Sequence, residues 1–330
     1  MTMTSMKPRC SLHRNRPQRL QTSSRVTVFH TSRRPSPRIS PSQATVKFNV
    51  TCSLPPPKNE LEATVRRKHK EVTERLENLG PEGVEFNLRY ATPSKSSHHL
   101  LKCITAANQM DARTALIIEV IQPQGDSSCQ SLVSRCEHLV AMGADALAAN
   151  TDAESTSRGS QELEAISATM SVPVVRLDWI IHPIQLTETT ALGATGITLV
   201  NCLLTSATEK MLRMCRTLKL DAIVEVVNSE ELNLALDYEA VMFGINISVG
   251  LSLALPGIKE QMSKNLIANI PPGAVSVVGV TSAAEAHAVA MAGASAVLLK
   301  KEALIGLSRE EMDILIREVK IALESTHIGE

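Results

Sequence analysis

The sequence predicts an α/β fold, a (β/α)8 barrel preceded by a helical extension. From Ala115 onward, eight short β-rich runs alternate with longer amphipathic stretches. The runs are apolar almost throughout, as expected for parallel strands that helices cover. A glycine follows three of the helical stretches, at Gly143, Gly193 and Gly293, where a left-handed residue commonly ends a helix. A doubly wound sheet has the same alternation, but the count of eight units favours the barrel.

The order of expected elements follows from hydrophobic periodicity. A polar helix is expected over residues 60–79, with Leu61, Val65, Val72 and Leu76 on one stripe, and Gly80-Pro81 ends it. A short second helix is expected over 97–107. The clearest later helices are expected over 129–142, 206–218, 282–292 and 309–323. The expected strands are 115–121, 144–149, 172–178, 195–200, 221–227, 240–246, 274–279 and 294–299.

The N-terminal region differs sharply in composition from the rest. No Asp or Glu precedes Glu60, whereas 11 Lys and Arg residues lie before it. An acid-free segment rich in Arg and Ser is typical of organelle transit peptides. We therefore expect a disordered chloroplast transit peptide over 1–52, a linker and helical extension over 53–112, and the barrel over 113–330. Mitochondrial import and a disordered basic arm that binds nucleic acid are the alternatives.

The remainder of the chain is acidic, with 23 Lys and Arg residues against 34 Asp and Glu residues. This balance argues against nucleic-acid binding, which needs a basic surface. No run approaches the 18 consecutive apolar residues of a membrane span. The seven cysteines form no Cys-x-x-Cys pair. Neither a GxGxxG nor a Walker motif occurs, so no cofactor is predicted, and no metal site is predicted either.

The stretch VPVVRLDWIIHPIQLT, residues 172–187, resembles the third-strand segment of indole-3-glycerol-phosphate synthases. Arg176, Asp178, Pro183 and Gln185 lie in register with that segment. The resemblance extends weakly from residue 60 to residue 325. It implies a barrel of the ribulose-phosphate-binding type. It also implies a lyase of tryptophan biosynthesis, which closes the indole ring with two lysines, a glutamate and a phosphate-binding loop.

The resemblance marks six candidate site residues. Glu119 and Glu225 match catalytic glutamate positions at the ends of the first and fifth strands, and we expect Arg176 to pair with them. Substrate-binding positions are the remaining four: Arg176, Asn246, Gly279 and Lys300. Asn246 is expected to serve as a structural amide or as a ligand, and Lys300 to hold an anion.

The departures from the family pattern concern its proton donors. Leu177 stands at the position of the general-acid lysine and Ile121 at that of the second lysine. One general acid contributes about 10²–10⁴ in rate, so losing both lysines raises the barrier by roughly 5 kcal/mol. Further departures are Ser248, Val277, Val278 and Lys300, where the family has an arginine, a glutamate, a serine and a glycine.

We therefore predict a pseudoenzyme of the chloroplast stroma that acts by binding, as an assembly, scaffold or regulatory factor. Its partner is expected to be a chloroplast protein or a phosphorylated small molecule. Two alternatives stay open. One is an active synthase with rearranged catalytic groups. The other is a different phosphosugar enzyme that uses Glu119, Glu225 and Lys300, and a mouth packed with Ile121, Leu177, Val277 and Val278 would argue against it.

Overall fold

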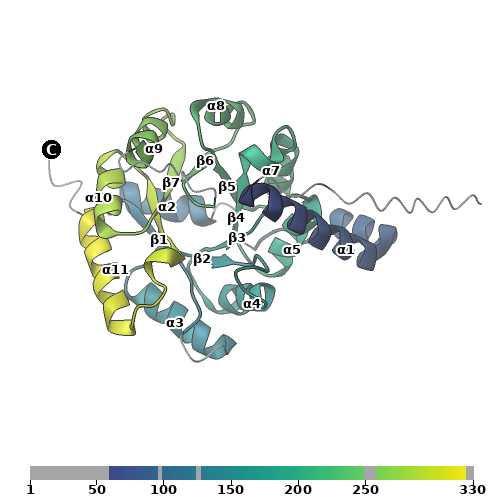
Figure 1. Ribbon diagram of the computed structural model, residues 1–330, viewed down its shortest axis with the longest axis horizontal. Helices are drawn as coiled ribbons and strands as arrows, with labels where there is room; N and C mark the ends of the chain where they lie inside the picture. Colours follow the sequence, from purple (N-terminus) through teal and green to yellow (C-terminus); the bar gives the residue numbers. More distant parts are fainter. Residues whose placement is uncertain (1–58, 96–98, 124–127, 249–257, 325–330) are drawn as a thin grey trace, which may run out of the picture. The chain divides into compact units, whose positions relative to one another are not determined.

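Eight parallel strands close into a barrel in a computed structural model, which describes residues 59–95, 99–123, 128–248 and 258–324 (Figure 1). Each strand pairs with the next along the chain, and β8 pairs with β1. This closure confirms the predicted barrel over the doubly wound sheet. The strands are β1 (Ala115–Glu119), β2 (Ala146–Asn150), β3 (Val174–Leu177), β4 (Gly196–Val200), β5 (Asp221–Glu225), β6 (Met242–Ile245), β7 (Val275–Val280) and β8 (Ala296–Leu299).

The helices that follow the strands form an outer ring, and the three glycines after helix ends adopt the expected positive φ, between 85° and 105°. The predicted later helices are confirmed to within one or two residues at each end. In the described part of the chain no helix is both long and apolar enough to cross a membrane. The helices are α1 (Glu60–Arg89), α2 (His99–Gln109), α3 (Cys129–Ala141), α4 (Gly159–Thr169), α5 (Pro183–Ala191), α6 (Asn201–Leu204), α7 (Ala207–Thr217), α8 (Ser229–Asp237), α9 (Ile258–Ala268), α10 (Ala283–Met291), α11 (Arg309–Glu324) and the 3-10 helix η1 (Lys301–Ala303).

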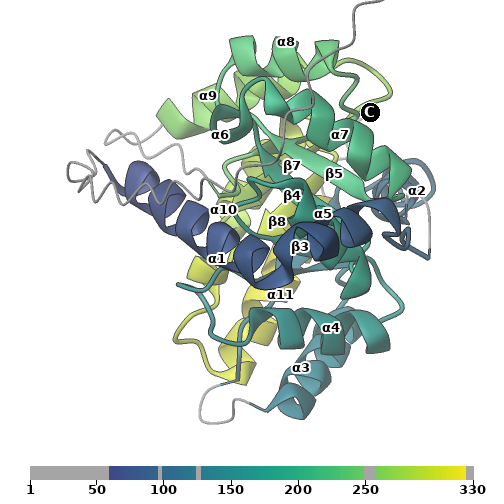
Figure 2. The same ribbon diagram turned by 90° about the vertical axis from the view of Figure 1, so that its right-hand side faces the viewer.

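Helix α1 consists of two helical segments joined at Gly80, whose φ of 67° and ψ of 166° are not helical. The sequence thus predicted correctly where the first segment ends, but the second segment, up to Arg89, was missed. Asn59 begins the helix, because its side-chain oxygen accepts a hydrogen bond from the Glu62 amide at 2.8 Å. Figure 2 shows α1 lying across the outside of the barrel next to α5, which it contacts.

The interior of the barrel holds an apolar group of side chains that we call the lumen cluster. Helix α2 closes the end of the barrel at which the strands begin, with Leu100, Ile104 and Ala107. Asp221 at the start of β5 accepts hydrogen bonds from the amides of Leu100 and Leu101 in the first turn of α2. The opposite end of the barrel, where the strands end, is therefore the mouth. The lumen cluster comprises Leu100, Ile104, Ala107, Ala115, Ile117, Ala146, Ala148, Val175, Leu177, Ile223, Met242, Ile247, Val275, Val277, Ala296 and Leu298.

Candidate active site at the barrel mouth

The last inward-facing residue of each strand forms a ring at the mouth. Strand residues alternate between the barrel axis and the helix layer, so a residue two positions after a lumen residue also faces the axis. On β1, for example, Ile117 lies in the lumen cluster and Glu119 follows it two positions later. The mouth ring consists of Glu119, Asn150, Leu177, Val200, Glu225, Asn246, Gly279 and Lys300. Five of the six predicted site residues thus come together.

Glu119 links the end of β1 to the segment after β8. Its Oε2 accepts a hydrogen bond from the Lys301 amide at 3.0 Å, and the residue is only 4% exposed. Burial raises the pKa of the Glu119 carboxyl, which the Lys301 amide and ammonium partly oppose. A carboxyl with a raised pKa in a polar setting can donate or accept a proton, so this group keeps a capacity for acid–base chemistry.

Glu225 binds the turn that follows β6. Its Oε1 accepts hydrogen bonds from the amides of Ile247 at 3.0 Å and Ser248 at 2.8 Å, and its Oε2 accepts from Ser248 at 3.0 Å. The turn begins at Asn246, a non-glycine residue with a φ of 58°. Such a conformation is costly unless the surroundings hold it, and the Glu225 carboxylate supplies part of that support.

Arg176 does not pair with either glutamate, so that expectation is wrong. Because Val175 and Leu177 face the axis, Arg176 between them points into the helix layer. Its Nη2 donates to Asp178 Oδ2 at 2.7 Å. Its other nitrogens donate to three further oxygens: Thr151 Oγ1, the Gln185 carbonyl and Thr189 Oγ1. The residue is 2% exposed and therefore lies away from the mouth ring.

Asn246, Gly279 and Lys300 are neighbours across the ends of β6, β7 and β8. The Asn246 side chain donates to the Gly279 carbonyl at 2.9 Å, and a Cβ on Gly279 would lie 2.0 Å from the Asn246 carbonyl oxygen. Glycine is therefore required for this close approach. The Lys300 side chain lies over Gly279, and its ammonium is 4.0 Å from a Glu302 carboxylate oxygen. Lys300 is the one cation of the mouth ring.

Apolar side chains stand where the resemblance implies a lysine and a glutamate, Leu177 in the mouth ring and Val277 deeper in the lumen. Leu177 is 6% exposed and Val277 is fully buried, both within the lumen cluster. Val278 faces the helix layer instead, against the expectation that it lines the mouth. Ile121 is only half buried and borders a cavity of about 270 Å³ beside β1 and β2, which Glu119, Asn150 and Lys301 also line. Among the described residues, apolar side chains therefore fill the centre of the barrel, and this cavity lies to one side of it.

The structure adds a buried ion-pair cluster that sequence reasoning missed. The Lys68 ammonium on α1 lies 2.8 Å from Asp178, 2.9 Å from Asp152 and 2.8 Å from Glu71, and its side chain is fully buried. Arg67 binds Asp152 through two hydrogen bonds of 2.8 Å. The signal was present, because Lys68 stands on the apolar stripe between Val65 and Val72, where a charge needs a buried partner.

Asp178 is the centre of this cluster. Burial raises the pKa of its carboxyl, but Arg176 and Lys68 outweigh burial and hold that pKa at about 2. The cluster joins α1 to the ends of β2 and β3, directly beside the position of Leu177. Within the described ranges, no group of three or more His, Cys, Asp and Glu side chains is arranged to hold a metal ion.

His182 is the residue that begins α5. Its Nδ1 accepts from the Ile184 amide at 3.2 Å, while the Gln185 side chain accepts from the His182 amide at 3.0 Å. This reciprocal arrangement is a capping box with proline at the first helical position. His182 is therefore a helix cap and not a member of the mouth ring.

Comparison with known proteins agrees with this architecture. Two relatives named indole-3-glycerol phosphate synthase are representative. The protein of Leptospira interrogans is 34% identical over 137 residues, covering 41% of this chain and 53% of its own. That of Chlorobium phaeovibrioides is 33% identical over 162 residues, covering 48% and 62%. The chain thus spans about half the length of the curated relatives it matches.

Among solved structures, a tryptophan synthase alpha chain from Legionella pneumophila has a TM-score of 0.54 at 17% identity, covering 70% of this chain and 98% of its own. At that identity the likeness shows the barrel fold alone. The model of the indole-3-glycerol phosphate synthase family, in contrast, matches residues 61–318, which include α1, all eight strands and most of α11. The chain belongs to the indole-3-glycerol phosphate synthase family.

Proposed function

We propose that this protein is a family member that acts by binding and does not close the indole ring. The observation that carries the proposal is Leu177, which faces the barrel axis where the family has its general-acid lysine and is packed among apolar side chains. A leucine has no titratable atom, so it cannot donate a proton to a reacting group. The chemical step then lacks its proton donor.

The remaining polar groups of the mouth support the same proposal. Both glutamates hold backbone amides, Glu119 at the start of η1 and Glu225 in the turn after β6. These hydrogen bonds explain why carboxylates stand at the mouth without any need for catalysis. The lysine on α1 cannot replace the absent one, because three carboxylates surround Lys68 and its pKa is raised despite its burial.

One observation favours a second candidate, a phosphosugar-binding enzyme of different chemistry. Lys300 brings a positive charge into the mouth ring next to Gly279, and its distance of 4.0 Å from Glu302 leaves the ammonium weakly paired. A phosphate held there would place a sugar near Glu119, whose carboxyl has a raised pKa. The packed lumen limits such a ligand to the outer edge of the mouth.

Complementation tests these functions. Residues 53–330 would be expressed in a tryptophan auxotroph that lacks its synthase, beside an active synthase as a positive control. We expect no growth without tryptophan. Growth would overturn the proposal and support the alternative of an active synthase in tryptophan biosynthesis. The variant I121K/L177K, which returns both lysines, tests whether the lost proton donors are the main deficit.

We further propose that the protein resides in the chloroplast stroma, where it would bind a protein partner as an assembly, scaffold or regulatory factor. The support is compositional, since residues 1–58 carry 11 basic and no acidic residues. Residues 1–58 fused to a fluorescent protein should enter plastids and be cleaved there. Fluorescence confined to mitochondria, or a fusion that stays uncleaved and binds RNA, would contradict this assignment.

A further inference from the structure

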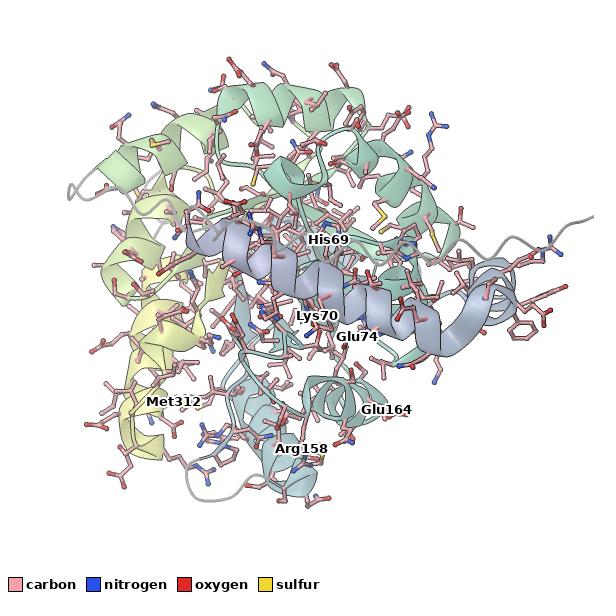
Figure 3. The ribbon with its side chains drawn as sticks, turned by 45° about the vertical axis from the view of Figure 1, so that its right-hand side comes forward. His69, Lys70, Glu74, Arg158, Glu164 and Met312 are labelled. Carbon is pink, nitrogen blue, oxygen red and sulfur yellow. The ribbon has the colours of Figure 1, made fainter. Side chains whose placement is uncertain are left out.

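A second cavity lies away from the mouth ring, between α3 and α11. Its volume is about 190 Å³, and it is bordered mainly by polar and basic side chains. Figure 3 labels Met312, an α11 residue that lines this cavity. The residues that line it include Ser131, Ser134, Arg135, His138, Arg309 and Met312.

Arg135 differs from Arg67 and Arg113 in the groups that surround it. It is half buried, and no carboxylate is among the groups that shift its pKa. Burial lowers the pKa of the Arg135 guanidinium, and the positive charge of Arg309 also lowers that pKa. Cys136 has the opposite effect, which is smaller than that of burial. Arg67 and Arg113 show the opposite case, because Asp partners raise the pKa of each. Arg135 is therefore a partly desolvated cation next to a like charge.

Arg309 faces the same cavity and is oriented by His138. Its Nη2 donates to His138 Nδ1 at 3.1 Å, and a guanidinium can only donate. His138 Nδ1 therefore accepts, so its Nε2–H donates to Asp313 Oδ1 at 2.7 Å. The Asp313 carboxylate thus binds this imidazole, and among the described residues no ion pair joins it to Arg135 or Arg309. Two positive charges remain at one cavity.

The other lining groups complement an oxyanion and a short organic group. Ser131 and Ser134 bring hydroxyls, which donate hydrogen bonds to phosphate oxygens. Pro123 and the buried Met312 add an apolar wall. Guanidinium groups bind phosphate oxygens through two parallel hydrogen bonds, which makes arginine the usual residue for this recognition.

We propose that this cavity binds the phosphate group of a small phosphorylated molecule. A phosphate monoester carries close to two negative charges at neutral pH, which offset the charges of Arg135 and Arg309. The volume of about 190 Å³ admits the phosphate and a few further atoms against Pro123 and Met312. This site is independent of the function proposed above, because none of its residues belongs to the mouth ring.

Isothermal titration calorimetry of the full chain with inorganic phosphate and with glycerol 3-phosphate tests the site. The variants are R135Q, R309Q and S134A, and the control is R213Q on α7, where Arg213 pairs with Glu209 at the surface. We expect glycerol 3-phosphate to bind, and R135Q or R309Q to weaken binding about tenfold or more, since each removes a charged two-point contact. S134A removes only one exposed hydroxyl, so it tests the site without risk to folding and should weaken binding less.

Comparing the wild-type chain with these variants also distinguishes phosphate binding at this cavity from phosphate binding by the basic N-terminal segment. Any phosphate bound by the Arg and Lys residues before Glu60 would appear equally in the wild-type chain and in every variant. Equal affinities of the wild-type chain, R135Q, R309Q and S134A would therefore overturn the proposal, as would the absence of any phosphate binding to the wild-type chain. A loss of affinity in R213Q as large as that in R135Q would overturn it as well.

Discussion

Replacing Lys68 with methionine should destabilise the protein strongly, because the change leaves buried carboxylates with one cation fewer. The Lys68 side chain is fully buried between Asp178, Asp152 and Glu71. Breaking a buried ion pair by removing one partner typically costs about 3–5 kcal/mol. Asp178 keeps Arg176 and Asp152 keeps Arg67, so we expect the low end of this range, about 3 kcal/mol of unfolding free energy.

The pH dependence provides an independent measure. The pKa of Asp178 is lowered from 3.8 to about 2 in the folded protein. At about 1.4 kcal/mol per pKa unit, this difference contributes about 2 kcal/mol, which is present above pH 4 and is lost as the pH falls toward 2. Part of that contribution belongs to Lys68 and part to Arg176. The difference between wild type and K68M should therefore shrink as the pH is lowered from 5 to 2.5.

Urea unfolding followed by circular dichroism at several pH values measures both quantities. The matched control is K70M on the same helix, because Lys70 is 80% exposed and lies 3.8 Å from Glu74 (Figure 3). Exposed pairs of this kind contribute little, so K70M should be close to wild type. A loss below about 1 kcal/mol in K68M at pH 7, or a loss that is equal at pH 7 and pH 2.5, would refute the reasoning.

Three further outcomes are expected. G279A should unfold at much lower urea concentration or fail to fold, since its Cβ would meet the Asn246 carbonyl at 2.0 Å, whereas G83A inside α1 should be tolerated. E119Q should be more stable than wild type at pH 8, where the buried carboxylate is ionised, and this gain should vanish below pH 4, because the folded pKa is raised. Thermal melts across this range measure it. Iodoacetamide should label four thiols more slowly in the native protein than in the unfolded chain, because burial raises their pKa to about 11 or 12: Cys103, Cys136, Cys202 and Cys215.

The strands and their order could be predicted from sequence because each strand is a short apolar run followed by a helical pattern. The same alternation predicts inward and outward faces once a strand's register is known. Arg176 shows the limit, since family resemblance suggested the mouth while the period of two placed it in the helix layer. A one-residue shift reverses the face of every side chain in a strand, so the placement of site residues needed the structure.

The ion-pair cluster on α1 escaped prediction for a different physical reason. Lys68 is separated from Asp152 and from Asp178 by more than 80 residues in the chain, and local periodicity contains no information on such contacts. The second segment of α1 was missed because Gly80-Pro81 is a valid stop signal, and only packing decides whether a helix resumes after it. The cavity between α3 and α11 likewise depends on two helices that are far apart in sequence.

The attachment of α1 also bears on how this protein can be shortened. Residues 56–330 form one compact unit, in which Lys68 balances acidic side chains beside β2 and β3 while α2 fills the lower end of the lumen. A fragment that starts at residue 113 would carry all eight strands, yet it would expose Asp152 and the interior apolar surface to water. Expression of the barrel alone should therefore yield insoluble protein, and a usable N-terminal boundary lies before Asn59.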